Sequence, residues 1–277
     1  MASGRMSSRL SEVTLFYGFL FSAYLLMTKF IRRKINCSIV VSNMGRISTG
    51  IEGLDKMLNG GLIPGRAYLV KGGPGAGKTT LAMHFLMEGI KNKEKGLYIT
   101  FEEPLSTLKE DMSKFGFNLD HPNIKIVDAT PVGEKKMIFA DVLYEEFATS
   151  FEKLARTISE EIKAEKYSRI VIDPLTMIKL TILDELEYRR TFMTFLKTIS
   201  KYKATILFTS ELMDSDIEEF LVSGVIELRT IEERGKTLRG IKIIKFRGST
   251  FDEELRPYRI TSKGIKVYHQ EVLFHGV

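Results

Sequence analysis

The sequence predicts an α/β fold, in which a mainly parallel, twisted sheet is flanked by helices and extended by antiparallel C-terminal strands. After Met44, short apolar runs alternate with longer amphipathic runs, which is typical of a parallel sheet covered by helices. A glycine-rich stretch, residues 72–79, separates one apolar run from the next amphipathic run. From Gly224 onward, short strand-like runs are separated by glycines, which indicates antiparallel strands.

The elements follow from these patterns in chain order. Parallel strands are expected at residues 67–71, 97–101, 124–128, 169–173 and 204–209. Helices are expected at residues 78–91, 104–115, 141–165 and 185–202. The C-terminal strands are expected in the runs VIELRT, GIKIIKF, YRIT and KVYHQ, with turns at Gly235, Gly248 and Gly264. The sequence contains no internal repeat, so we expect one copy of this unit.

The composition indicates one globular domain, residues 44–277, preceded by an extension. Hydrophobic residues make up 44% of the 277 residues, enough for a sizeable core. The net charge is +6, but residues 1–43 hold six Lys and Arg residues and one Glu, so the excess lies there. The basicity therefore does not indicate that the domain binds nucleic acid. The single cysteine, Cys37, excludes an intrachain disulfide framework and favours a cytoplasmic location.

The extension contains an uncharged, mostly apolar run at residues 13–28, and a basic cluster follows at residues 32–34. If Lys29 turns its charge toward the membrane surface, the apolar stretch extends to residues 13–31 and reaches the lower limit of about 17 residues that can cross a bilayer. The segment is therefore a candidate membrane anchor, which would leave the domain on the cytoplasmic side. Two alternatives stay open. In the first, the native protein starts at Met44 and the preceding residues are translated leader sequence. In the second, the apolar run packs as a buried helix against the domain.

Residues 72–79 match the phosphate-binding motif G-x4-G-K-[ST] in full. The motif is expected between a strand and a helix, where backbone N–H groups and the helix N-terminus surround phosphates. Lys78 would reach the outer phosphates, and the hydroxyl of Thr79 would ligate magnesium (Mg2+). The residues predicted to bind ATP are Gly72, Gly73, Pro74, Gly75, Ala76, Gly77, Lys78, Thr79 and Thr80.

Three acidic residues follow predicted strands and are expected at the same sheet edge as this loop. Asp173 ends the run RIVID, where its carboxylate would hold magnesium together with Thr79. Glu102 and Glu103 follow the run LYITF, and one of them would orient or deprotonate the attacking water. The alternative for these two is a solvated helix start before Pro104. Together with Lys78, the three acids predict magnesium-dependent hydrolysis of ATP.

Several linked motifs, from Met44 to about Tyr268, resemble the KaiC-like branch of the RecA superfamily. These motifs are STGIEGLDKMLNGGLIPG, KGGPGAGKTT, YITFEEP, RIVIDPLT, SGVIELR, KFRGST and YRITSKGIKV. The resemblance implies a single RecA-like P-loop NTPase domain of the archaeal type. It also implies a homo-oligomer, expected to be a hexameric ring, with nucleotide at the subunit interfaces.

The resemblance further implies roles for individual residues. In the family the paired glutamates activate water, a role that falls on Glu102 and Glu103. Lys245 and Arg247 lie two residues apart, on one face of a strand. The family pattern implies that both reach the γ-phosphate bound by the neighbouring subunit, where they would stabilise transition-state charge.

The chain also departs from the family pattern. After KFRG the circadian members carry a His and a Lys that help to hold the nucleotide, whereas this chain has Phe251 and Glu253, which leaves the base preference open. The Asp that ends the RIVID run is usually followed by Ser, but here by Pro174. The phosphorylated pair of the circadian domain aligns with Glu219 and Phe220, so autokinase activity at that place is excluded.

Three functions agree with these motifs. The first is an oligomeric ATP-hydrolysing switch or scaffold for protein partners. The second is a RecA/RadA-paralogue type of ATPase that binds single-stranded DNA, but an expected loop at residues 211–220 has five acids and no basic residue, which disfavours nucleic acid. The third is an archaellum-type accessory ATPase, which needs residues 13–31 to be a real membrane anchor. The four histidines lack ligand spacing, so no zinc site is expected.

Overall fold

The computed structural model describes residues 45–129, 156, 158–179, 182, 184–211, 216–233 and 235–273. The chain divides into two units, Met1–Gly45 and Arg46–Val277, and the fold below is that of the second unit. No helix among the described residues has both the length and the apolar character needed to cross a membrane. The candidate anchor at residues 13–31 lies outside the described residues.

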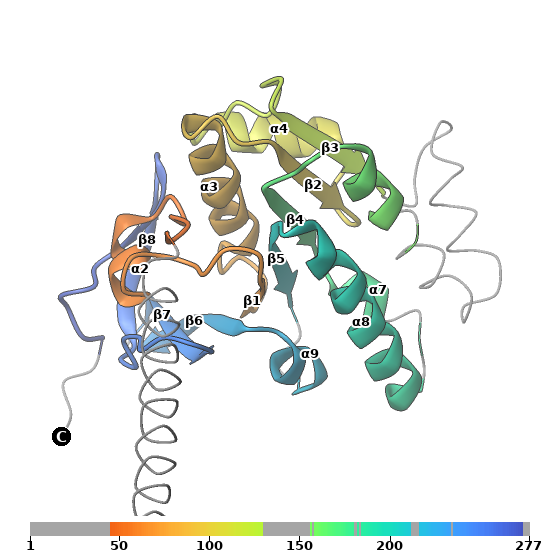
Figure 1. Cartoon of the computed structure of the whole chain (residues 1–277). Coiled ribbons are helices and arrows are strands. Elements are labelled where there is room, and N and C mark those ends of the chain that lie inside the picture. Colours follow the sequence, from red (N-terminus) through yellow and green to blue (C-terminus); the bar gives the residue numbers. More distant parts are fainter. Residues whose placement is uncertain are drawn as a thin grey trace, which may run out of the picture. The chain divides into compact units, whose positions relative to one another are not determined.

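The described strands form a nine-stranded sheet in the order β3-β2-β4-β5-β1-β6-β7-β8-β9 (Figure 1). Six strands are parallel: β1 (Ala67–Gly72), β2 (Gly96–Thr100), β3 (Ile124–Asp128), β4 (Arg169–Asp173), β5 (Thr205–Ser210) and β6 (Gly224–Glu233). Three antiparallel strands extend the sheet: β7 (Lys236–Phe246), β8 (Arg256–Thr261) and β9 (Gly264–Val267). The predicted fold class is thereby confirmed.

Three helices are as expected, namely α3 (Lys78–Lys91), α4 (Leu105–Ser113) and α8 (Glu185–Ile199), which is followed by a 3-10 turn, η1 (Ser200–Tyr202). Residues 158–164 are helical and belong to the helix expected at residues 141–165. The structure adds α2 (Glu52–Met57), α7 (Thr176–Lys179) and α9 (Asp216–Leu221), which were not expected. The expectation of a loop throughout residues 211–220 was therefore wrong, and the strand expected in KVYHQ ends at Val267.

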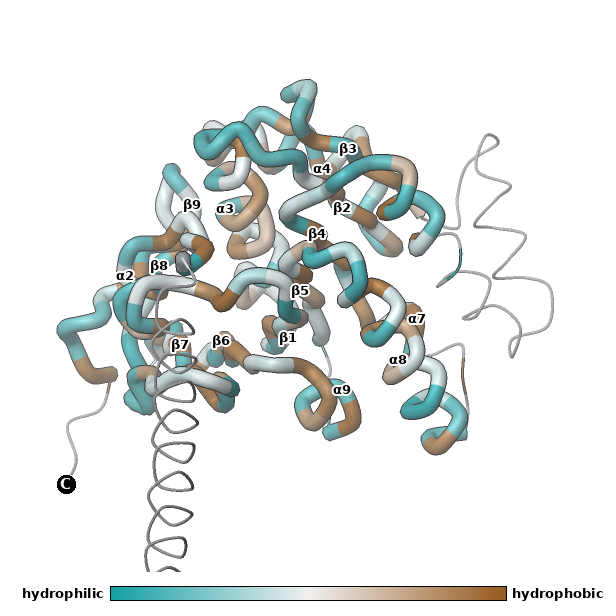
Figure 2. Tube along the Cα trace, viewed as in Figure 1, coloured by the Kyte–Doolittle hydropathy of each residue, from teal (hydrophilic) through white to brown (hydrophobic). Residues whose placement is uncertain are grey.

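Both faces of the sheet are buried, because neighbouring residues of a strand point to opposite faces. Val70 of β1 packs with the buried face of α3, whereas Leu69 belongs to the cluster that contains the buried residues of α8. All residues of β2 and β4 are accordingly buried, while hydrophilic residues dominate α4 (Figure 2). The helix layers and the sheet between them hold the carboxyl ends of the parallel strands at one edge, where the P-loop, Asp173 and the paired glutamates lie.

The C-terminal hairpin of β8 and β9 packs closely against α3. Gly264 has a φ of +84°, and a Cβ atom at this position would lie 2.2 Å from Nε2 of His84. Glycine is needed here both for the left-handed backbone and for the close approach. The hairpin of β8 and β9 therefore packs directly against α3, the helix that begins at the phosphate-binding motif.

Candidate nucleotide site

The glycine-rich motif forms the connection between β1 and α3. β1 ends at Gly72, and Gly77 is the N-cap of the 14-residue helix α3. Gly77 has a φ of +90°, a left-handed conformation that other residues rarely adopt. A Cβ atom on Gly72 would lie 2.6 Å from the carbonyl oxygen of Leu228. The loop therefore wraps tightly around a helix N-terminus, which is a favourable place for an anion.

Lys78 is held inside this loop. Its side chain is only 7% exposed, and its Nζ donates hydrogen bonds to the carbonyl oxygens of Gly72 (2.9 Å) and Gly73 (3.1 Å). The same Nζ lies 3.4 Å from Oε1 of Glu211, which directly follows β5. The positive charge is thus at the concave side of the loop. Sequence reasoning gave Glu211 no role at this site, although its position after a strand matches that of Asp173.

Asp173 and Thr79, the two predicted magnesium ligands, are in direct contact. Thr79 Oγ1 donates to Oδ2 of Asp173 at 2.9 Å, and the carboxylate is 7% exposed. Two strands beside β4 orient this carboxylate: Tyr98 of β2 donates to Oδ2 at 2.5 Å, and Thr209 of β5 donates to Oδ1. Burial, with the neighbouring Asp173 charge, raises the pKa of Tyr98 well above its ordinary value, so the phenol stays a donor.

The spacing of the two oxygens also fits a metal. Adjacent ligands of an octahedral magnesium ion, each at about 2.0–2.1 Å, lie roughly 2.9 Å apart. The Thr79 and Asp173 oxygens have this separation. Magnesium usually takes only one or two carboxylates and completes its shell with water and phosphate. The two residues therefore suit magnesium, and no group of three or more metal-binding side chains is found in the described part of the chain.

Glu102 and Glu103 leave the sheet beside Asp173. The backbone N–H of Phe101 donates to the carbonyl oxygen of Asp173 at 3.0 Å, which holds the chain after β2 against the end of β4. Thr100 then fixes a tight turn, because its hydroxyl donates to the carbonyl oxygen of Glu103 at 2.9 Å. The two glutamates therefore lie at the predicted edge, and Glu102 is the more exposed of the two.

The pKa values of both carboxyl groups are raised. For Glu102 the causes are burial, followed by the negative charges of Glu211 and Asp173, which are partly offset by Lys78. For Glu103 burial again comes first, followed by nearby carboxylates that include Asp173. A carboxylate with a raised pKa is a stronger base, which suits a group that orients or deprotonates water.

Lys245 and Arg247, in contrast, are placed away from the loop of their own chain. In the sheet Lys245 pairs with Val225 near the start of β6, whereas Gly72 pairs with Leu228. Three residues of strand separate these levels, roughly 10 Å. Both side chains instead donate to backbone carbonyls at the end of α9. The structure thus gathers the P-loop, Asp173 and the glutamates, but not these two cations.

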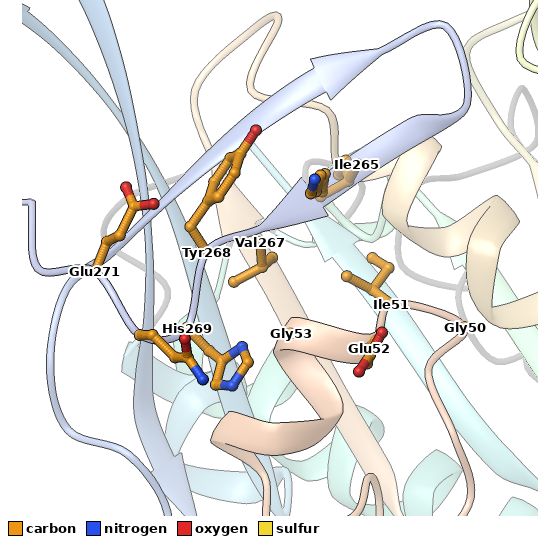
Figure 3. A pocket seen from close by; sticks show the side chains of 11 residues that line it. Gly50, Ile51, Glu52, Gly53, Ile265, Val267, Tyr268, His269 and Glu271 are labelled. Carbon is orange, nitrogen blue, oxygen red and sulfur yellow. The ribbon is translucent and has the colours of Figure 1, made fainter.

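Two hollows lie near the C-terminal strands. The larger, about 710 Å³, is lined by β7 and β8 and adjoins the P-loop through Tyr258, whose hydroxyl donates to the carbonyl oxygen of Ala76 at 2.6 Å. The smaller, about 320 Å³, lies between α2 and β9, with Ile51 and Val267 facing it (Figure 3). None of the predicted site residues lines this second pocket, so it is not the phosphate site.

The comparisons with known proteins agree with the geometry. The family model "ATPase: KaiC" matches residues 47–272. A UPF0273 protein of Thermotoga maritima is 30% identical over 243 residues, which cover 82% of this chain and 97% of that protein. The circadian clock oscillator protein KaiC of Parathermosynechococcus lividus is 33% identical over 232 residues, which cover 79% of this chain and 42% of that protein. This chain thus spans less than half the length of that relative.

The solved structures give the same result. A KaiC-like protein from Pyrococcus horikoshii OT3 has a TM-score of 0.68 and 28% sequence identity, and the match covers 80% of this chain and 98% of the other. The family match, residues 47–272, spans the positions of all the predicted site residues, from the P-loop through Asp173 to Arg247. The predicted resemblance is confirmed. The chain belongs to the KaiC family of ATPases.

Proposed function

We propose that this protein binds ATP with magnesium at residues 72–80, hydrolyses it, and acts as an oligomeric switch or scaffold. The contact between Thr79 and Asp173, 2.9 Å, is the observation that carries the proposal. The contact supports the proposal because a hydroxyl and a carboxylate lie beside the glycine-rich loop at a spacing compatible with two adjacent magnesium ligands. Thr79 and Asp173 would hold the ion, which when bound neutralises charge on the phosphates.

The chain's own residues supply the rest of the chemistry. Lys78, held at the loop carbonyls, would turn its charge to the outer phosphates. Glu102 or Glu103 would hold the attacking water and take its proton, helped by the raised carboxyl pKa. Tyr98 and Thr209 would keep the Asp173 carboxylate in one orientation. We favour hydrolysis of ATP over binding alone, because the candidate bases Glu102 and Glu103 lie at the same edge of the sheet as the phosphate-binding loop.

Lys245 and Arg247 are proposed to act on the nucleotide of a neighbouring subunit in a homo-oligomer, for which a hexameric ring is expected. Support comes from the register of β7, which keeps both residues away from the loop of their own chain. Cations that stabilise transition-state charge from a neighbouring protein raise turnover by orders of magnitude. A cytoplasmic location is part of the same proposal.

The other two functions have less support. Three of the acids in residues 211–220 pair with lysines of the same chain: Glu211 with Lys78, Glu218 with Lys179, and Glu219 with Lys71. These pairings partly neutralise the three acids but add no free basic residue for a DNA backbone. Binding of single-stranded DNA is therefore not favoured. The archaellum-type role depends on residues 13–31, which lie outside the described residues.

The experiment combines ATP turnover with light scattering of the full chain, with and without ATP and magnesium. We expect an oligomer and measurable turnover, and the turnover should be lost in Lys78→Ala. Lys91→Ala, at the exposed end of the same helix, is the matched control and should keep both. Equal mixing of Lys78→Ala with Arg247→Ala should restore turnover if the cations act across the interface. A monomer without turnover would overturn the central proposal.

A further inference from the structure

The short helix α9 is anchored from several sides. Glu218 is 2% exposed, and it accepts a hydrogen bond from the hydroxyl of Tyr188 at 2.8 Å and pairs with Lys179 at 3.4 Å. Glu219 pairs with Lys71 of β1 at 2.6 Å. Each of these ionic groups is at least partly buried, so α9 is fixed to α7, α8 and the central sheet. A helix of this length would not be stable without such contacts.

The last turn of α9 receives both proposed trans-acting cations. Lys245 Nζ donates to the carbonyl oxygens of Glu219 and, at 3.0 Å, of Phe220. Arg247 Nη2 donates to the carbonyl oxygen of Phe220 at 2.6 Å. Carbonyl groups at a helix C-terminus lack partners within the helix and carry partial negative charge, which favours cations.

The side chain of Phe220 adds a second contact. The guanidinium of Arg247 lies over its ring, 6.0 Å from the centroid, and that of Arg189 lies 4.9 Å from the centroid. Phe220 is 59% exposed as a residue, so core packing does not explain an aromatic residue here. Aromatic faces attract guanidinium groups and restrict their orientation. Backbone and side chain of one residue therefore both hold Arg247.

We infer that Phe220 is a positioning residue, which holds Arg247 and Lys245 in the orientation they present to the neighbouring subunit. The inference rests on the proposed function, in which these cations act on the neighbour's nucleotide. The helix α9, which binds the two cations, also contacts the strand that leads into the P-loop of the same chain. Glu219 of α9 pairs with Lys71, the residue before Gly72 of the P-loop. The end of α9 that holds Lys245 and Arg247 is thus linked by an ion pair to β1, the strand that precedes the P-loop.

The test measures ATP turnover of the full chain with Phe220→Ala and Phe220→Tyr. We expect Phe220→Ala to lower kcat by about fivefold with KM changed by less than about twofold, because a lost cation–π contact frees the guanidinium. Phe220→Tyr keeps the aromatic face and should stay near the wild-type kcat. Met193→Ala, which removes another exposed apolar side chain on the neighbouring helix α8, is the control and should leave kcat unchanged. Thermal unfolding should be the same in all four proteins.

Two further measurements separate this inference from the proposed function. The double variant Phe220→Ala, Arg247→Ala should turn over no more slowly than Arg247→Ala alone, since Phe220 acts through Arg247. A mixture of Phe220→Ala with Lys78→Ala should recover turnover, as is expected of the mixture of Arg247→Ala with Lys78→Ala.

The outcomes are distinguishable. If Arg247→Ala and Lys78→Ala fail to complement each other, the proposed action of Lys245 and Arg247 on the neighbouring subunit is refuted. The double variant still tests whether Phe220 positions Arg247. If they complement but Phe220→Ala matches the wild type, or its effect adds in full to that of Arg247→Ala, the positioning role is overturned.

Discussion

His84 joins the P-loop helix to the C-terminal hairpin, and its protonation should control the stability of that junction. Its Nε2 accepts a hydrogen bond from the backbone N–H of Ile265 at 2.9 Å, and its ring packs edge-on against Phe117. Burial, followed by the charge of Lys91, lowers the pKa of His84 from 6.5 to about 4. An imidazole nitrogen that accepts a hydrogen bond must be unprotonated, so the folded state holds the neutral ring.

The sign and size of the effect follow from linkage. The unfolded chain binds a proton at His84 below pH 6.5, whereas the folded chain binds it only near pH 4. The stabilising contribution is therefore complete above pH 6.5 and is lost as the pH falls toward 4. At about 1.36 kcal/mol per pKa unit, acidification from about pH 7.5 to 5 should remove about 2 kcal/mol, and the full loss is about 3 kcal/mol.

His84→Gln provides the comparison, because the glutamine amide oxygen also accepts a hydrogen bond but does not titrate. The free energy of unfolding would be measured in urea at pH 7.5 and at pH 5 for both proteins. The wild type should lose about 2 kcal/mol more than the variant between these conditions. Other titrating groups are common to both proteins and cancel in the difference. Equal losses in the two proteins would refute the reasoning.

Four further predictions concern the site and its support. Asp173→Asn should lower ATP turnover by about a hundredfold or more, because it removes the carboxylate charge that would face the proposed magnesium ion; turnover measured at increasing magnesium concentrations is the assay. Tyr98→Phe keeps the packing but removes the 2.5 Å hydrogen bond to Asp173, so kcat should fall by roughly fivefold. Glu102→Gln and Glu103→Gln, assayed separately, should identify the base: one should abolish turnover while ATP still binds, and neutral behaviour of both would contradict the assignment. Arg169→Met should cost about 3 kcal/mol in urea unfolding, since this 1% exposed guanidinium bonds Glu94 and two backbone carbonyls; a loss under about 1 kcal/mol would contradict that.

Much of the fold and part of the site were predictable because their signals are local in the chain. The P-loop was identified from the spacing of its glycines and of Lys78, and its place between strand and helix followed from a change of hydrophobic period. Asp173 was recognised as the last residue of an apolar run. Helices of four to six residues, such as α9, give no comparable signal, since their stability comes from tertiary contacts.

The sequence by itself therefore determined the P-loop, the acid at the end of β4, and the alternation of strands and helices. Only the tertiary structure decided which residues meet Asp173, because Tyr98 and Thr209 reach it through the strand order β2-β4-β5. It also decided the environment of Glu218, which the charge pattern placed in an acidic loop and which is buried against Tyr188. Pairing between strands far apart in the chain, and burial on a helix too short to have its own pattern, are long-range properties that depend on the packed core.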